Sequence, residues 1–332
     1  MTSHLIEPLE SERIVHVTGE QVRQLLDMST CIDLMRAALV SLGTGKAHQM
    51  VRPVLPLDGR NVLGMMPAYD QSAQVAGAKV LSVFPDNSEH GRASHQGVIV
   101  LFDTVTGALK AVVDAEQVTA IRTAAASAAA TDALARPDAS RLAILGSGVQ
   151  AWQHLSAIAQ VRELRYVTVW SRNTAKAEAF ATRALVENGI GVTVCDTVHA
   201  ATSDADIICT VTSSVEPILK ARDVKPGSHI NAVGSCTPDA RELSSDLVAA
   251  GELYVDWAPA ALKEAGDLLL AIKEGAVTSH HVVGEVGKVI AGTLSGRARA
   301  DSVTIYESLG QAVQDLLAAN YVVDALTRGD RS

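Results

Sequence analysis

Short apolar runs alternate with longer stretches of helical periodicity from residue 141 onward. The runs RLAILG (141–146) and RYVTVW (165–170) are typical of buried strands, and helical patterns follow them at 149–160 and from 174 to about 187. The later runs GVTVC, DIICTV and HINAVG also read as strands. Because strands and helices alternate at this spacing, the sequence predicts an α/β domain with a doubly wound parallel sheet.

A glycine-rich stretch joins the first of these strands to the first helix. In GSGVQA, Gly146 allows a tight turn, Gly148 allows the backbone to approach a phosphate closely, and Ala151 allows helix and strand to pack closely. A tight strand–helix turn without a ligand is the alternative interpretation. The position of the stretch, after a strand and at the start of a βαβ series, favours a Rossmann-type dinucleotide site, with the pyrophosphate at the helix N-terminus.

The end of the second strand indicates which dinucleotide is bound. An NAD site usually places an acidic residue there to hold the ribose 2′-hydroxyl, but this chain has Ser171, Arg172 and Asn173. An arginine suits the 2′-phosphate of NADP, which a carboxylate would repel. A solvated loop arginine is the alternative. The sequence therefore predicts NADPH as the cofactor, with NADH as the second candidate.

Three cations in the first half of the chain stand in unusual contexts. Lys79 interrupts the apolar run QVAGAKVLSVFP, so it either snorkels from an edge strand or faces a cleft that holds an anionic ligand. Arg122 interrupts a helix of closely packed alanines, where it either pairs with a neighbouring helix or binds a ligand. Arg52 precedes Pro53, which favours an extended conformation. If they converge, these side chains form a clamp for a carboxylate.

Composition and charge narrow the class of protein. The 332 residues suffice for two domains, and the net charge of −9 without Lys/Arg blocks argues against nucleic-acid and membrane partners. No segment approaches the roughly 20 apolar residues of a membrane span, and residues 1–17 carry acids where a signal peptide needs an apolar run. The scattered Cys31, Cys195, Cys209 and Cys236 predict a metal-free, cytoplasmic protein.

Several blocks, in order, resemble one known family. The stretches AGAKVLSVFPDN, SHQGVIVLFDTVTGALKAVVDAEQVTAIRTAAASAAA, LAILGSGVQAWQHL, VWSRN and INAVGSCTPDARELSSD are similar to the ornithine cyclodeaminase/mu-crystallin family. The resemblance implies a homodimer in which the Rossmann-type domain, residues 126–298, is inserted into a second, α+β domain. That domain, residues 1–125 plus 299–332, would bind the substrate and form the dimer contact.

The resemblance also assigns roles to residues. It implies that Arg52, Lys79 and Arg122 are catalytic residues that hold a substrate α-carboxylate. His95 lies beside this site in the sequence and is either a functional residue or a structural hydrogen-bonding group. The cofactor contacts that the resemblance implies are Ser94, Thr123, Gly146, Ser147, Gly148, Val149, Gln150, Ser171, Arg172, Asn173, Thr210, Asn231, Ala232, Val233 and Gly234.

One departure from the family pattern bears on the reaction. Cyclodeaminases resemble NAVGGDCPGKTEL here, with an aspartate that handles the substrate amines, whereas this chain has Cys236 at that place and Asp239 three residues later. We therefore expect reduction of a cyclic ketimine, Δ1-pyrroline-2-carboxylate to L-proline or Δ1-piperideine-2-carboxylate to L-pipecolate. Ornithine cyclodeaminase, alanine dehydrogenase and non-catalytic binding of a small ligand are the alternatives.

Overall fold

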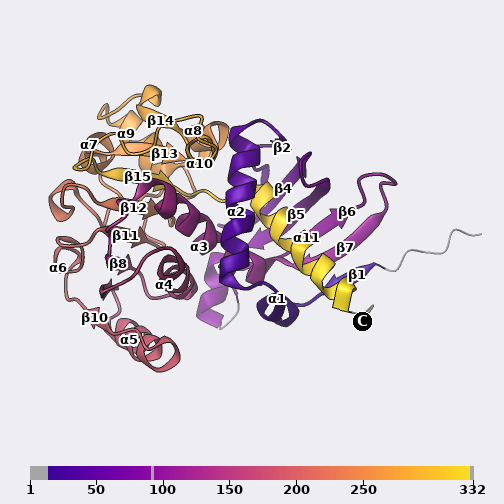
Figure 1. Cartoon of the computed structure of the whole chain (residues 1–332), viewed down its shortest axis with the longest axis horizontal. Coiled ribbons are helices and arrows are strands. Elements are labelled where there is room, and N and C mark those ends of the chain that lie inside the picture. The colour runs from indigo at the N-terminus through magenta and orange to yellow at the C-terminus, as the bar shows by residue number, and fades with distance from the viewer. Residues whose placement is uncertain (1–13, 91–92, 330–332) are drawn as a thin grey trace, which may run out of the picture.

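Two β-sheets organise the chain in the computed structural model, which describes residues 14–90 and 93–329 (Figure 1). Residues 1–13, on which much of the signal-peptide prediction rests, lie outside this range. The first sheet has the order β1-β7-β6-β5-β4-β2, with β3 paired to β4, and β4 to β7 run antiparallel. Its strands are β1 (Val15–Val17), β2 (Ala47–Gln49), β3 (Val54–Pro56), β4 (Val62–Asp70), β5 (Val75–Val83), β6 (His95–Phe102) and β7 (Leu109–Asp114).

The second sheet is parallel throughout and confirms the predicted α/β class. Its order is β10-β9-β8-β11-β12-β15-β13-β14, so β8 lies between β9 and β11. Its strands are β8 (Arg141–Leu145), β9 (Tyr166–Trp170), β10 (Val192–Val194), β11 (Ile207–Thr210), β12 (His229–Ala232), β13 (Glu252–Val255), β14 (Val282–Glu285) and β15 (Thr304–Glu307). The intervening helices are α4 (Val149–Val161), α5 (Thr174–Asn188), α6 (Val198–Thr202), α7 (Ser245–Ala250), α8 (Ala258–Glu264), α9 (Gly266–Lys273) and α10 (Val286–Ile290).

The alanine-rich helix α3 (Ala115–Leu134) joins the two sheets. It begins directly after β7, where the Asp114 side chain accepts a hydrogen bond of 2.8 Å from the Gln117 N–H and caps the helix. The helix is buried on nearly every side and packs against α2 (Met28–Gly43) and α4. Small side chains allow these helices to approach closely, so α3 forms a rigid connection between the two parts (Figure 1).

The chain returns to the first sheet at its end. β15 pairs with β12 and β13 in the second sheet, and α11 (Ala312–Gly329) then packs on β4, β5 and β6 (Figure 1). The buried run TIYE (304–307) thus belongs to the second sheet, whereas the predicted boundary at 298/299 placed it in the other domain. The strand pairing puts the crossing after residue 307.

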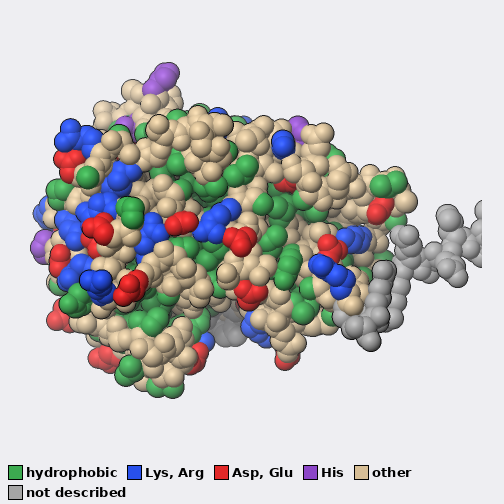
Figure 2. Space-filling view, in the orientation of Figure 1, with side chains coloured by type: hydrophobic (Ala, Val, Ile, Leu, Met, Phe, Trp, Pro, Cys, Tyr) green, Lys and Arg blue, Asp and Glu red, His purple; other side chains and the backbone are tan. Residues whose placement is uncertain are grey.

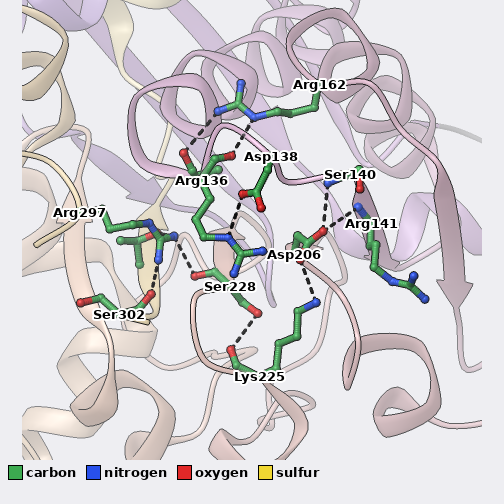
Figure 3. A network of polar contacts seen from close by, with 12 residues as sticks. Arg136, Asp138, Ser140, Arg141, Arg162, Asp206, Lys225, Ser228, Arg297 and Ser302 are labelled. Carbon is green, nitrogen blue, oxygen red and sulfur yellow. Dashed lines mark hydrogen bonds and ion pairs between the residues drawn. The ribbon is translucent and has the colours of Figure 1, made fainter. Parts of the chain in front are cut away.

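The amino edge of the second sheet, where its strands begin, is fixed by one carboxylate. Asp206 precedes β11 and accepts hydrogen bonds from the backbone N–H groups of Ser140 (3.0 Å) and Arg141 (3.1 Å). It also contacts Arg136 Nη2 at 2.9 Å and Lys225 Nζ at 2.8 Å (Figure 3). The starts of β8 and β11 and the turn before β12 are therefore tied to a single side chain.

Charges of both signs are interspersed on the surface. Figure 2 shows Lys and Arg side chains next to Asp and Glu over the second-sheet part of the visible face. Within the described part of the chain, the helices are too short or too polar to cross a bilayer.

Candidate active site

The glycine loop after β8 has the geometry of a phosphate-binding turn. Gly146 has a φ of +129°, and a Cβ there would lie 2.8 Å from the Val211 carbonyl oxygen, so only glycine fits. A Cβ on Gly148 would meet no heavy atom within 4 Å and would project into open space, where a ligand can approach. Helix α4 begins at Val149 without a side-chain cap, which leaves its first N–H groups available for an anion.

A cavity of about 940 Å³ opens at this carboxyl edge of the second sheet, where its strands end. Ser94 reaches it from the segment before β6, so both parts of the chain line it. His95 begins β6, and its side chain lies outside what the structure describes. The lining residues are Ser94, Gly146, Ser147, Gly148, Val149, Gln150, Trp152, Trp170, Ser171, Arg172, Asn173, Lys176, Ala179, Phe180, Arg183, Val211, Thr212, Ser213, Ser214 and Ile218.

The end of β9 forms the basic end of the cavity. Ser147 Oγ donates to Ser171 Oγ at 3.1 Å, which joins the glycine loop to the end of β9. Asn173 caps α5 by accepting a hydrogen bond of 3.0 Å from the Lys176 N–H. Arg172 and Lys176 line the cavity here, and none of its described lining residues is acidic. This end of the cavity therefore suits a phosphate better than a bare ribose hydroxyl.

The remaining predicted cofactor residues do not line this cavity. Asn231 is fully buried in β12, where its Nδ2 donates to Thr131 Oγ1 on α3 at 2.9 Å. The segment 211–214, which follows β11, lines the cavity instead. The predicted residues in question are Thr123, Thr210, Asn231, Ala232, Val233 and Gly234.

Lys79 and Arg122 converge on a carboxylate of the chain itself. Lys79 lies on the inner face of β5, and its Nζ forms an ion pair with Asp315 Oδ2 of α11 at 2.7 Å. Arg122 Nε donates to the same carboxylate at 2.8 Å, and its Nη1 donates to Gln314 Oε1 at 3.1 Å. Lys79 therefore occupies neither a sheet edge nor an unpaired position in a cleft, because α11 supplies its partner.

This burial shifts the pKa of both partners. Burial lowers the pKa of Lys79 to about 8, although the adjacent Asp315 opposes the shift. Burial alone would raise the pKa of Asp315, but Arg122 and Lys79 outweigh it and lower that pKa below its ordinary value. A lysine with a pKa near 8 loses its proton far more readily than an exposed one, which is a property of general acids.

Arg52 has other partners than Lys79 and Arg122, and its side chain is more exposed to solvent than theirs. Its Nη2 donates to the carbonyl oxygens of Leu309 (3.1 Å) and Gly310 (3.2 Å) and lies 3.7 Å from Glu264 of α8. The Leu309 and Gly310 N–H groups donate to Asp256 at the end of β13. Arg52 therefore lies at the carboxyl edge of the second sheet, and its Nε is buried without a hydrogen-bond partner.

Buried carboxyl groups gather at the same edge, around Glu307. Burial raises the pKa of Asp256 to about 6 and that of Asp267 to about 7. Burial and the neighbouring carboxyl groups raise the pKa of Glu307 well above its ordinary value, and its two oxygens lack hydrogen-bond partners. Burial also raises the pKa of Glu242. This edge therefore holds carboxyl groups that protonate closer to neutral pH than exposed ones do.

Sequence reasoning did not identify the acidic partners in this site. Asp315 had a detectable signal, since it stands between Val313 and Leu316 in an apolar helix that packs on a sheet. Glu264 and Glu242 lie in segments that read as solvated, and the sequence gives no sign of their burial. In the described part of the chain, no group of three His, Cys, Asp or Glu side chains is arranged to hold a metal ion.

The chain is similar to known proteins over nearly its full length. The family model described as the ornithine cyclodeaminase/mu-crystallin family matches residues 13–330. The ketimine reductase mu-crystallin of Mus musculus is 40% identical over 318 residues, which cover 94% of this chain and 97% of that protein.

Two solved structures have the same fold over both sheets. The Δ1-pyrroline-2-carboxylate reductase of Thermococcus litoralis, in complex with NADH and L-proline, has a TM-score of 0.92 and 31% identity, covering 96% of this chain and 98% of that one. An archaeal alanine dehydrogenase dimer with bound NAD has a TM-score of 0.90 and 29% identity, covering 96% and 97%. The chain therefore belongs to the ornithine cyclodeaminase/mu-crystallin family.

Proposed function

We propose that this protein is an NAD(P)H-dependent oxidoreductase that reduces the C=N bond of a cyclic ketimine carboxylate. Δ1-Pyrroline-2-carboxylate, which gives L-proline, is the first candidate substrate, and Δ1-piperideine-2-carboxylate, which gives L-pipecolate, is the second. The names of the mouse and Thermococcus relatives support this reaction class. The main observation behind the proposal is the group of three cations, Arg52, Lys79 and Arg122. This group lies at the carboxyl edge of the second sheet, which also bears the glycine loop.

The charges in this group favour a substrate carboxylate. Arg52, Lys79 and Arg122 face two carboxylates, Asp315 and Glu264, so one positive charge is left over. The Arg52 side chain is 19% exposed, whereas those of Lys79 and Arg122 are 4% and 5% exposed. Arg52, with its unpartnered Nε, is therefore the first contact for the incoming carboxylate, and the two buried cations add to its field.

Lys79 is the proton donor in this proposal. A nicotinamide, when bound, would supply the hydride, and an imine carbon accepts a hydride more readily when its nitrogen is protonated. The N–H bond at Lys79 Nζ breaks, an N–H bond forms on the ring nitrogen, and Asp315 remains ionised 2.7 Å from the neutral amine. The pKa of about 8 supports this role, since transfer from such a group is most efficient near the operating pH.

NADPH is the proposed cofactor, with NADH as the alternative. Arg172 and Lys176 line the cavity at the end of β9, and no acidic residue lines it there among those described. The two solved relatives are described with NADH and NAD, so the dinucleotide class is common to them, and the choice of NADPH rests on this chain's basic residues.

The test is a substrate panel with purified protein. Reduced cofactor consumption should be measured with the five- and six-membered ring imines and with pyruvate plus ammonia, using NADPH and NADH in turn. We expect the highest kcat/KM with a ring imine and NADPH. Higher kcat/KM with pyruvate plus ammonia would assign an alanine dehydrogenase, and binding of the imine without turnover would assign a ligand-binding protein.

Cyclodeamination of ornithine is the second candidate, and one observation favours it. Asp239 is exposed, but Glu307 is a buried carboxyl group close enough to Cys236 for that residue to contribute to the raised pKa of Glu307. Release of ammonia from L-ornithine with oxidised cofactor should stay well below imine reduction. Comparable turnover that is abolished in Glu307→Gln would show that Glu307 replaces the missing aspartate.

We further propose a cytoplasmic homodimer. The four cysteines are free thiols, as is usual in a reducing compartment. The outer face of the first sheet exposes Leu63, Met65, Val98 and Phe102, and a neighbouring structure is described as a dimer. Light scattering should give about 70 kDa, twice the chain mass of 34.8 kDa, and Met65→Glu should shift the protein toward monomer.

A further inference from the structure

One buried carboxylate joins the loops that follow β11 and β12. Glu242 lies between β12 and α7 and is fully buried. Its Oε1 accepts hydrogen bonds from the Thr212 N–H and from Thr212 Oγ1, each 2.6 Å long. Its Oε2 accepts one of 2.7 Å from the Gly234 N–H. Each carboxylate oxygen therefore holds a different loop.

Neighbouring groups fix Glu242 in this position. Asp267 Oδ1 accepts from the N–H groups of Glu242 (2.9 Å) and Leu243 (2.7 Å). A Cβ on Gly234 would lie 2.6 Å from the Glu242 carboxyl group and 2.1 Å from the Thr212 carbonyl oxygen. The two loops and the carboxylate are thus in direct contact, with no room for a larger residue at 234 or for water between them.

The strand order assigns these loops to one half of the cofactor. The glycine loop follows β8, and the basic residues that suit the adenosine 2′-phosphate follow β9 on one side of it. β11 and β12 lie on the other side of β8, so their loops face the nicotinamide half of a dinucleotide that crosses the sheet at β8. Thr212 lines the cavity on that side.

We propose that Glu242 is a positioning residue that sets the separation of the loops after β11 and β12 and thereby shapes the nicotinamide half of the cofactor cavity. This inference rests on the proposed dinucleotide site. Glu242 acts through Thr212, which lines the cavity, while its bond to the Gly234 N–H anchors the carboxylate to the loop after β12. Both its oxygens accept hydrogen bonds, so its ionised form fits the site, and an amide would direct an NH2 group at a backbone N–H.

The experiment separates the two halves of the cofactor. Isothermal titration should compare Glu242→Gln with the wild type, using NADPH and adenosine 2′,5′-bisphosphate, which carries only the adenosine half. We expect NADPH to bind about 10-fold more weakly to the variant, because the cavity is no longer preorganised. The bisphosphate should bind within about 2-fold of the wild type, and the KM for NADPH should rise while the KM for the imine stays unchanged.

A matched control and a milder variant complete the test. Glu285 at the end of β14 is a buried carboxylate that accepts the Ala258 N–H and pairs with Lys288 Nζ at 3.1 Å. It contacts neither Thr212 nor Gly234, so Glu285→Gln should leave both affinities unchanged. Thr212→Val removes one of the three hydrogen bonds and should weaken NADPH about 3-fold, which keeps the test valid if Glu242→Gln does not fold.

The outcomes distinguish this inference from the proposed function. If the wild type binds NADPH and Glu242→Gln binds it equally well, or if both probes weaken alike, the positioning role is overturned while the dinucleotide site stands. If the wild type binds neither NADPH nor NADH, the proposed function fails and this inference fails with it.

Discussion

Buried carboxyl groups at the two edges of the second sheet have pKa values that are shifted in opposite directions. At the amino edge, Asp206 is paired with Arg136 and Lys225. Burial acts to raise its pKa, but the hydrogen bond and charge of Lys225 and the backbone N–H groups of Ser140 and Arg141 outweigh burial and lower it. At the carboxyl edge, Glu242 and Asp256 receive the hydrogen bonds described above from neutral groups, and burial raises the pKa of each. Asp206 is thus held by two cations as well as by backbone N–H groups, whereas the hydrogen bonds described for Glu242 and Asp256 come from neutral donors.

This difference shows where the fold combines stability with binding. Ion pairs at the amino edge tie strand starts together. At the carboxyl edge, hydrogen bonds from loop backbones hold buried carboxyl groups beside the cavity where parallel sheets bind ligands. The following tests ask whether the amino edge serves stability and the carboxyl edge serves binding. They run from the largest expected effect to the smallest.

Asp206→Ala should have the largest effect, and only on stability. Two backbone N–H groups and two cations lose their shared partner, so we expect the free energy of unfolding to fall by about 3 kcal/mol in chemical denaturation. NADPH affinity should not change. The control is Asp204→Ala. The exposed Asp204 carboxylate pairs with Arg141, so its removal should lower the free energy of unfolding by less than about 1 kcal/mol. A large loss of NADPH affinity in Asp206→Ala would contradict this division of roles between the edges.

Arg52→Ala should impair catalysis and leave stability nearly intact. Removing the accessible cation should lower kcat/KM for the ring imine by about 30- to 100-fold, or about 2–3 kcal/mol of transition-state stabilisation. Arg60→Ala is the control, because Arg60 is an exposed arginine paired with Asp86. Wild-type kinetics in Arg52→Ala would remove it from the substrate site.

The two edges should respond to acid in opposite directions. His229 begins β12 at the amino edge, and burial lowers its pKa to about 3. Below its ordinary value of 6.5 the unfolded state binds a proton that the folded state excludes, so stability is lost as the pH falls. Asp256 and Asp267, with raised pKa values, have the reverse effect, since the folded state holds their protons up to about pH 6 and 7.

A comparison of variants isolates the histidine contribution. Relative to His229→Gln, the wild type should lose about 1 kcal/mol of unfolding free energy per pH unit from pH 6.5 to 5. Denaturant titrations of both proteins at several pH values measure this difference. If the unfolding free energies of the two proteins changed with pH in parallel, His229 would not have the lowered pKa that its burial predicts.

Arg172→Ala should have the smallest effect, confined to the cofactor. We expect the NADPH Kd to rise about 10-fold, or about 1.4 kcal/mol, with little change for NADH. Arg165 is the matched control, because it precedes β9 at the amino edge, whereas Arg172 follows the same strand. A preference of the wild type for NADH would refute the proposed role of Arg172.

Local patterns predicted the elements whose signals lie in their own sequence. The strand at 141–145 and the helix at 149–161 were both found, because a buried strand, a glycine turn and a periodic helix are contiguous in the chain. The strands β13 to β15, at the far side of β12 in the sheet, were not identified from the sequence. Their pairing depends on contacts far apart in sequence.

The sequence predicted only those site residues that stand in an unusual local context, such as a charged residue in an apolar run. A lysine in an apolar strand signals an unusual environment, but Lys79 gave no indication that its partner is Asp315, 236 positions later in the chain. In the same way, ARELSSD reads as a solvated loop, although Glu242 is completely buried. Partners that topology brings together leave no local pattern.

The return of α11 to the first sheet has a consequence for synthesis on the ribosome. Lys79 and Arg122 are made early, but Asp315 emerges only after the whole second sheet has been translated. Until then Lys79 on β5 and Arg122 on α3 lack their shared carboxylate, and the inner face of β5 lacks its covering helix. The first sheet therefore closes after the nucleotide-binding sheet, and a chain that stops before residue 312 leaves this face open to aggregation and proteolysis.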